Sequence, residues 1–155
     1  MENLFLWRLE LENGKGYYQA LDPFDPASEA PAEGDGFGHY PRTPLPFQDG
    51  LPQFTPWGDG GEWGDRHIFG FTTIAAARSW FPHAGALAIW SDEGGRLAAY
   101  PRKLCKDIQE GRHQCVFIPP PGRLKKRAVL PAVDLWQREE NELLSLVLHD
   151  LEALL

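Results

Sequence analysis

Glycine and proline dominate residues 14–64, which hold ten glycines and eight prolines. Proline removes backbone hydrogen-bond donors and glycine raises the entropic cost of ordering, so this stretch excludes long helices and central strands. The composition of residues 22–36 is typical of disorder, whereas the aromatic side chains of residues 37–66 argue against a plain linker. We therefore expect a long loop region over 22–66, the later part of which lies over the core and lines any site.

Regular structure is expected on both sides of this region. Alternation of side chains predicts a strand over 3–12, followed by a turn at Asn13-Gly14 and a short returning strand at 16–20. Later segments predict two helices, one from Thr72 or Thr73 to residue 81 and one over 132–155, and strands at 69–71, 86–90, 96–100 and 114–118. The fold expected is α+β, with a small, mostly antiparallel sheet, two helices and a long aromatic loop layer rich in proline and glycine.

The length of 155 residues predicts a single domain over 1–155. No apolar run reaches the roughly 18 residues of a membrane span, and the first residues lack the features of a signal peptide. Two cysteines do not make a disulfide framework. We therefore expect a reduced, cytoplasmic protein without a membrane partner.

The net charge of −7 is unevenly distributed. Residues 1–65 carry twelve acids and three bases, residues 66–130 four acids and eleven bases, and residues 131–155 six acids and one base. Because phosphate attraction drives general nucleic-acid binding, we expect no such binding from an acidic chain. The basic middle third either forms a local basic patch or is neutralised by the flanking acidic blocks.

The spacing of the histidines and cysteines in the sequence gives little support for a metal site or a reactive thiol. None of the five histidines has the spacing of a helical metal pair, so we expect no metal site. Cys105 lies among Arg102, Lys103 and Lys106, which would lower the pKa of its thiol, but it has no flanking catalytic signature. The favoured interpretation is an inert cysteine.

Three segments occur in an order that resembles the ADP-ribosyltransferase fold. They are Arg8 in the first strand, Thr72-Thr73 at the start of a helix, and HQCVFIPPPG over 113–122. The resemblance implies NAD as cofactor, Arg8 as the cation that holds it, Thr72 and Thr73 as the hydroxyl motif, and His113-Gln114 at the acidic pair. A carboxylate there would stabilise the oxocarbenium-like sugar.

This sequence departs from that family because no acid occurs between Arg112 and Pro121. An acid would then have to come from elsewhere, such as Glu110. The structural alternative is that Arg8 pairs with Glu10 or another acid, that a threonine only caps the helix, and that VFIPPPG is a buried strand with its exit. Outside the ADP-ribosyltransferase interpretation we expect no cofactor.

Four segments, two of which overlap those just named, are similar to small accessory proteins of bacterial phages and mobile elements. They are HYPRTPLPFQD at 39–49, FGFTT at 69–73, SWF at 79–81 and GRHQCVF at 111–117. The resemblance implies a protein that binds and inhibits or modulates a host protein or nucleoprotein complex, as anti-CRISPR and other anti-defence proteins do. This binding function is the one we favour; the alternatives are an ADP-ribosyltransferase that modifies a host protein and a structural or immunity-type partner.

Two surfaces are candidates for binding. The loop region offers aromatic anchors within an acidic rim, a combination that suits a basic partner; its residues are Tyr40, Phe54, Trp57, Asp59, Glu62, Trp63 and Asp65. The C-terminal helix leaves Leu146, Leu148 and Leu155 at least partly off its core face, so a homodimer through this helix is one expectation. Cover by residues 22–36 is the alternative.

Overall fold

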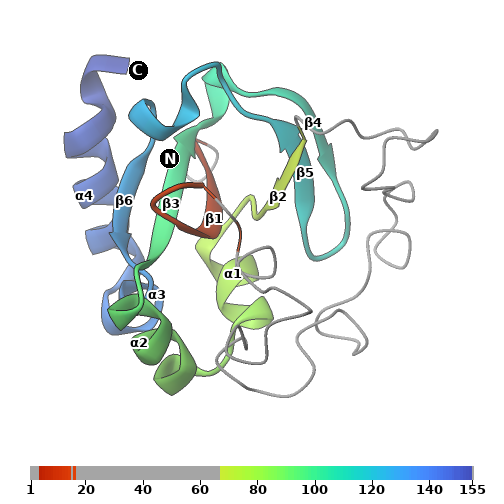
Figure 1. The fold of residues 1–155 in the computed structure, drawn as a ribbon. Coiled ribbons are helices and arrows are strands. Elements are labelled where there is room, and N and C mark those ends of the chain that lie inside the picture. The colour runs from red at the N-terminus through yellow and green to blue at the C-terminus, as the bar shows by residue number, and fades with distance from the viewer. Residues whose placement is uncertain (1–3, 15, 17–66, 155) are drawn as a thin grey trace.

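The computed structural model describes residues 4–14, 16 and 67–154. Figure 1 shows two small sheets, with helices to the left of them and below them. The strands are β1 (Phe5–Leu11), β2 (Ile68–Gly70), β3 (Gly95–Pro101), β4 (Lys106–Glu110), β5 (Cys115–Ile118) and β6 (Ala128–Pro131). The α-helices are α1 (Ile74–Trp80), α2 (Ala84–Asp92), α3 (Asp134–Gln137) and α4 (Glu140–Leu151).

The strands form two three-stranded sheets in which every pairing is antiparallel. One sheet has the order β1-β3-β6 and the other the order β2-β5-β4. Trp7 and Phe71 join the two sheets through reciprocal backbone hydrogen bonds of 2.8 and 2.7 Å. The expected α+β class with a mostly antiparallel sheet is therefore confirmed.

Strand β1 is buried on both faces because it lies between two apolar layers. Its odd-numbered residues, such as Trp7 and Leu9, pack with the helices, while Leu6 on the opposite face packs with Tyr100 and Phe117. Alternation along a strand sends successive side chains to opposite faces. The second layer encloses Arg8 and Glu10, which share the face of Leu6.

Several predicted elements are confirmed. The structure contains the first strand, the Asn13-Gly14 turn, the strands at 96–100 and 114–118, and the helix after Thr73. Thr73 is the N-cap of α1, and its hydroxyl accepts a hydrogen bond of 3.0 Å from the amide of Ala76. Of the returning strand at 16–20, only Gly16 is described, and it forms a bridge with Glu10.

The strand predicted at 86–90 is wrong, because these residues belong to helix α2. The run ALAIW does not alternate, and a short apolar run fits a buried strand and a helix equally well. Leu87 and Trp90 are buried at helical spacing, whereas Ile89 is 59% exposed. The buried side chains of this segment therefore have the spacing of a helix and do not alternate as those of a strand would.

The prediction of a single C-terminal helix over 132–155 is also wrong, because α3 and α4 are separate helices. Arg138 is extended, and Glu139 caps α4 through a capping box with Glu142. The described residues thus contain four α-helices instead of two, and strands β4 and β6 were not predicted. In α4, Leu143, Val147 and Leu151 face the core.

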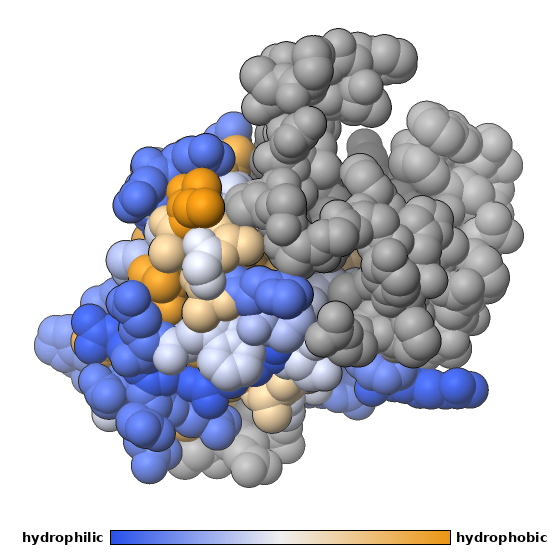
Figure 2. Space-filling model, turned by 90° about the horizontal axis from the view of Figure 1, so that it is seen from below, coloured by the Kyte–Doolittle hydropathy of each residue, from blue (hydrophilic) through white to orange (hydrophobic). Residues whose placement is uncertain are grey.

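Six large hydrophobic side chains are exposed among the described residues. Seen from below, hydrophobic residues occupy small areas among hydrophilic ones (Figure 2). Ile89 and Trp136 are both exposed, and the guanidinium of Arg78 lies 5.7 Å from the centre of the Trp136 ring. In α4, Leu146 is 37% exposed, while Leu148 is partly buried against the core and Leu155 lies outside the described residues.

Candidate functional site

Glu10 is a completely buried carboxylate at the centre of a group of arginines. It lies near the end of β1, on the same strand face as Arg8, because residues two apart on a strand share a face. A buried charge is costly unless it is paired and hydrogen-bonded. Four side chains meet this requirement around Glu10.

Both carboxylate oxygens of Glu10 accept two hydrogen bonds each. Oε2 accepts from Arg8 Nε at 2.8 Å and from Arg123 Nη1 at 2.9 Å. Oε1 accepts from the hydroxyl of Tyr100 and from Arg127 Nη1. We call Arg8, Glu10, Tyr100, Arg123 and Arg127 the arginine cluster.

The arginine cluster also fixes the turn that follows β1. Arg123 Nη2 donates to the carbonyl of Gly14 at 2.8 Å, and Arg127 Nη2 donates to the carbonyl of Glu12 at 2.6 Å. A Cβ atom at Gly16 would lie 2.7 Å from Arg8 Nη2, so a side chain at this position would displace the Arg8 guanidinium. The turn and the cluster therefore depend on each other.

The charges of the cluster hold Glu10 ionised. Burial acts to raise the pKa of Glu10, but the charge of Arg8 and the hydrogen bond from Tyr100 oppose it, and the charges of Arg123 and Arg127 add to them. The net result is a pKa below the ordinary value. Burial and the neighbouring carboxylate raise the pKa of Tyr100, so its hydroxyl keeps its proton and acts as a donor.

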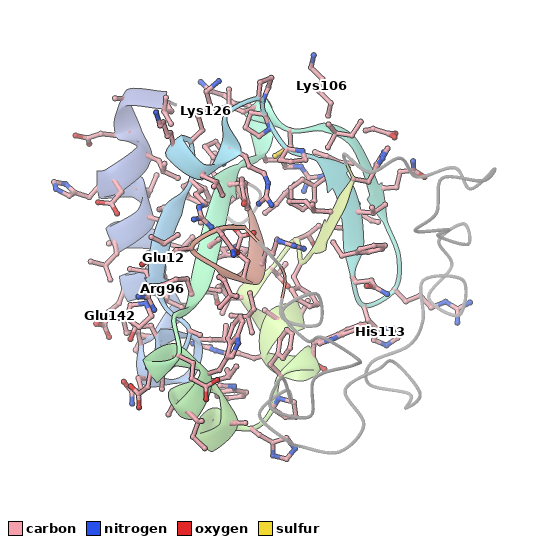
Figure 3. The ribbon with its side chains drawn as sticks, in the orientation of Figure 1. Glu12, Arg96, Lys106, His113, Lys126 and Glu142 are labelled. Atoms are coloured by element: carbon pink, nitrogen blue, oxygen red, sulfur yellow. The ribbon has the colours of Figure 1, made fainter. Side chains whose placement is uncertain are left out.

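Positive charge exceeds negative charge within the cluster. Three guanidinium groups surround one carboxylate, which leaves an excess of two positive charges. The nearby carboxylate of Glu12 is directed toward Arg96, at 3.2 Å, as Figure 3 shows. Burial lowers the pKa of Arg8 even though the charge of Glu10 opposes this effect.

Arg123 and Arg127 enclose a short basic segment, RLKKR, which we call the basic turn. It begins after Gly122, whose φ of +68° is favourable for glycine, and its first three residues form a 3₁₀ turn. The two arginines point inward to Glu10, whereas Leu124 is 44% exposed and Lys125 is exposed. The turn thus presents a leucine and lysines to solvent on an anchored backbone.

The residues implied by the ADP-ribosyltransferase resemblance lie near one another in the backbone. Trp7 bridges Phe71, and Gly70 pairs with Cys115, so the segments of Arg8, Thr72 and Gln114 meet at one end of β2 and β5. Their side chains have structural partners. Arg8 binds Glu10 and the carbonyl of Phe69, and Thr73 caps α1.

The other residues of that interpretation are placed as follows. Gln114 is buried, and its backbone carbonyl accepts a hydrogen bond of 2.7 Å from the backbone amide of Gly111. His113 is exposed. Figure 3 shows His113 far from Lys126 of the basic turn. Glu110, the acid considered for the missing carboxylate, lies 3.9 Å from Arg102.

The remaining predictions from the sequence concern the loop surface, the cysteines, metal binding and membrane spans. The predicted loop surface, with Tyr40, Phe54, Trp57, Asp59, Glu62, Trp63 and Asp65, lies outside the described residues. Burial raises the pKa of the Cys105 and Cys115 thiols to about 12, against the smaller opposing effect of Arg102. In the described ranges there is no group of three residues that could hold a metal ion, and no helix there is long and apolar enough to span a membrane.

Sequence reasoning missed Tyr100, Arg123 and Arg127 as site residues. Their partners lie far away in the sequence, so local spacing carries no sign of the contacts. Two signals were available: Glu10 shares the strand face of Leu6 and Arg8, and the run RLKKR follows a proline-glycine turn. A charged residue on a buried strand face requires a partner of opposite charge.

One comparison with known proteins finds a match. A sequence profile derived from phage proteins matches residues 1–128, which include the whole arginine cluster, so this chain is a phage accessory protein. The family is the bacteriophage T4 Y00F protein, and with 128 of 155 residues matched the chain belongs to it. No curated protein matches the chain, and no solved structure matches it either.

Proposed function

We propose that this phage accessory protein acts by binding a host protein or nucleoprotein complex, which it inhibits or modulates as anti-CRISPR and other anti-defence proteins do. Membership of a phage family supports the setting. The basic turn is the observation that carries the proposal, because it combines an exposed leucine with lysines on a segment anchored at both ends.

An anchored turn is a favourable binding element for a physical reason. Binding costs free energy when loops and side chains become ordered, and a segment that is already fixed loses less freedom. Glu10 holds Arg123 and Arg127, so the backbone between them is ordered before any partner arrives. Leu124 supplies apolar area, and the charges of Lys125 and Lys126 favour a partner surface with an acidic rim around an apolar depression.

Affinity capture from a lysate of the bacterial host tests this proposal. The expected result is a specific partner that the wild-type protein retains and that the double variant Leu124→Asp, Lys125→Glu loses. Ile89→Asp is the matched control, because Ile89 is an exposed apolar residue on α2, outside the turn. Far-UV circular dichroism and thermal unfolding verify that both variants fold.

The outcomes separate clearly. Equal retention by the double variant and the control would remove the basic turn from the binding surface. The tryptophans of the loop region are then tested by Trp57→Ala and Trp63→Ala. Absence of any partner in all captures would contradict the binding function itself.

A second candidate function is an NAD-dependent ADP-ribosyltransferase. The observation that favours it is the backbone proximity of the Arg8, Thr72 and Gln114 segments. The test is release of nicotinamide from millimolar NAD, together with a mass gain on any captured host protein. Neither signal is expected if the protein acts by binding alone.

A further inference from the structure

The arginine cluster has more positive charge than its own carboxylate can neutralise. Glu10 already accepts two hydrogen bonds at each oxygen, so its acceptor capacity is largely used. Two guanidinium charges remain in excess among the described residues. Excess buried charge of one sign destabilises a fold unless an ion of opposite charge is bound nearby.

One donor of the cluster also lacks an acceptor. Arg127 has only 5% of its side chain exposed, and its Nε atom is buried without a hydrogen-bond partner among the described residues. Native proteins leave few buried donors unpaired, so each such group calls for a specific explanation. Its other nitrogens donate to Glu10 and to the carbonyls of Leu11 and Glu12.

Arg123 connects this region to solvent. Its side chain is 23% exposed, and its guanidinium lies 6.0 Å from the centre of the Tyr100 ring. The lysines of the basic turn follow it two and three residues later, and Figure 3 shows Lys126 beside β6. Lysines at such a position raise the local concentration of anions.

We propose that the arginine cluster binds an oxyanion with two negative charges, of the phosphate-monoester class, against Arg123 and Arg127. The planar fork of a guanidinium suits phosphate oxygens, and Arg127 Nε gains the acceptor that it lacks. The inference is independent of the proposed host partner, because it concerns a small ligand of the isolated protein.

Thermal unfolding of the full-length protein in inorganic phosphate tests the site. Sodium chloride at matched ionic strength is the reference, and a nucleoside monophosphate forms a second arm. A ligand that binds only the native state raises its stability, so at a hundredfold excess over Kd we expect the Tm to rise by roughly 5–10 °C. Binding to the wild-type protein is measured separately by calorimetry and by ³¹P line broadening.

Two variants and a control locate the site. Arg127→Lys and Arg123→Lys keep the charge but remove the fork, and each is expected to weaken phosphate binding at least tenfold. Arg112→Lys changes an exposed arginine outside the cluster and should bind as the wild-type protein does. Calorimetry on the folded variants keeps this comparison valid if one of them has a lower Tm.

The outcomes have distinct meanings. Equal affinity for both ligands assigns the site to free phosphate, and tighter binding of the nucleotide assigns it to a phosphorylated small molecule. No phosphate effect beyond that of chloride, or an unchanged affinity in both cluster variants, overturns the proposal. Host-protein capture is a separate measurement, so either proposal can fail alone.

Discussion

Arg127 and Glu10 lie 117 residues apart in the sequence and form an ion pair from which solvent is almost excluded. Arg127 directly precedes β6 and Glu10 lies near the end of β1, two strands that do not hydrogen-bond to each other because β3 lies between them. Side chains thus connect the two outer strands of this sheet across its middle strand. The stability of the sheet should depend on the charge of Glu10.

Replacing Glu10 by glutamine should destabilise the fold strongly. The variant removes a carboxylate that contacts three arginines, and breaking a buried ion pair in this way costs about 3–5 kcal/mol. Urea unfolding should show a lower midpoint. Glu12→Gln is the control, because Glu12 forms an exposed ion pair with Arg96 that is expected to be worth less than about 1 kcal/mol. Equal losses in the two variants would contradict the central role of Glu10.

The carboxylate of Glu10 should also make the folded protein less stable in acid. The pKa of Glu10 is lowered in the folded protein from an ordinary value of 4.5. A carboxyl whose pKa is depressed by folding stabilises the protein fully above the unfolded value, and this contribution is lost as the pH falls through the folded value. The urea midpoint of the wild-type protein should therefore decrease below about pH 4.5. Glu10→Gln should show a smaller decrease, and parallel curves would exclude Glu10 as the cause.

Two glycines should respond in opposite ways to alanine. A Cβ atom at Gly95 would lie 2.3 Å from the ring of Trp90, whereas one at Gly85 in helix α2 would meet nothing within 4 Å. Gly95→Ala should thus lower the free energy of unfolding by about 1–3 kcal/mol through overpacking. Gly85→Ala should raise it by about 0.5–1 kcal/mol through helix propensity. Denaturant titrations of both variants provide the test, and a neutral Gly95→Ala would show that the Trp90 ring moves readily.

Both cysteines should be unreactive in the native protein. Cys105 and Cys115 are buried, and burial raises the pKa of each thiol to about 12, so the reactive thiolate is scarce at neutral pH. A thiol reagent such as Ellman's reagent should label neither residue at pH 8 and both in denaturant. Rapid labelling of native Cys105 would support the reactive interpretation based on its basic neighbours.

The sequence predicted those elements whose signals are local. Alternation identified β1, and a threonine before an apolar helix, Thr72 or Thr73, identified the start of α1, which Thr73 caps. The run ALAIW at 86–90 is apolar throughout, so its hydropathy pattern favours neither a strand nor a helix. In the structure this segment is helical, and Leu87 and Trp90 are buried in the core. Strand β4 is mostly exposed and has an irregular register near Asp107, whose φ is +49°, so it lacks the alternation of a regular strand.

The site was predicted only where its residues are close in sequence. Arg8 was singled out, and its pairing with Glu10 was named as the structural alternative, because the two residues are neighbours on one strand face. Tyr100, Arg123 and Arg127 reach Glu10 only through the pairing of β1, β3 and β6. Contacts over such separations follow from the tertiary fold, so their discovery required the structure.

The order of the strands also has a consequence for synthesis. Strand β1 leaves the ribosome before its partner β3, and two of the three arginines that contact Glu10, Arg123 and Arg127, follow more than a hundred residues later. At roughly 5–20 residues per second, this interval lasts several seconds. During that time the apolar residues of β1 stand exposed on the nascent chain. Arg8 and Glu10 place charge among these apolar residues, which is the pattern by which gatekeeper residues reduce the aggregation of exposed strands.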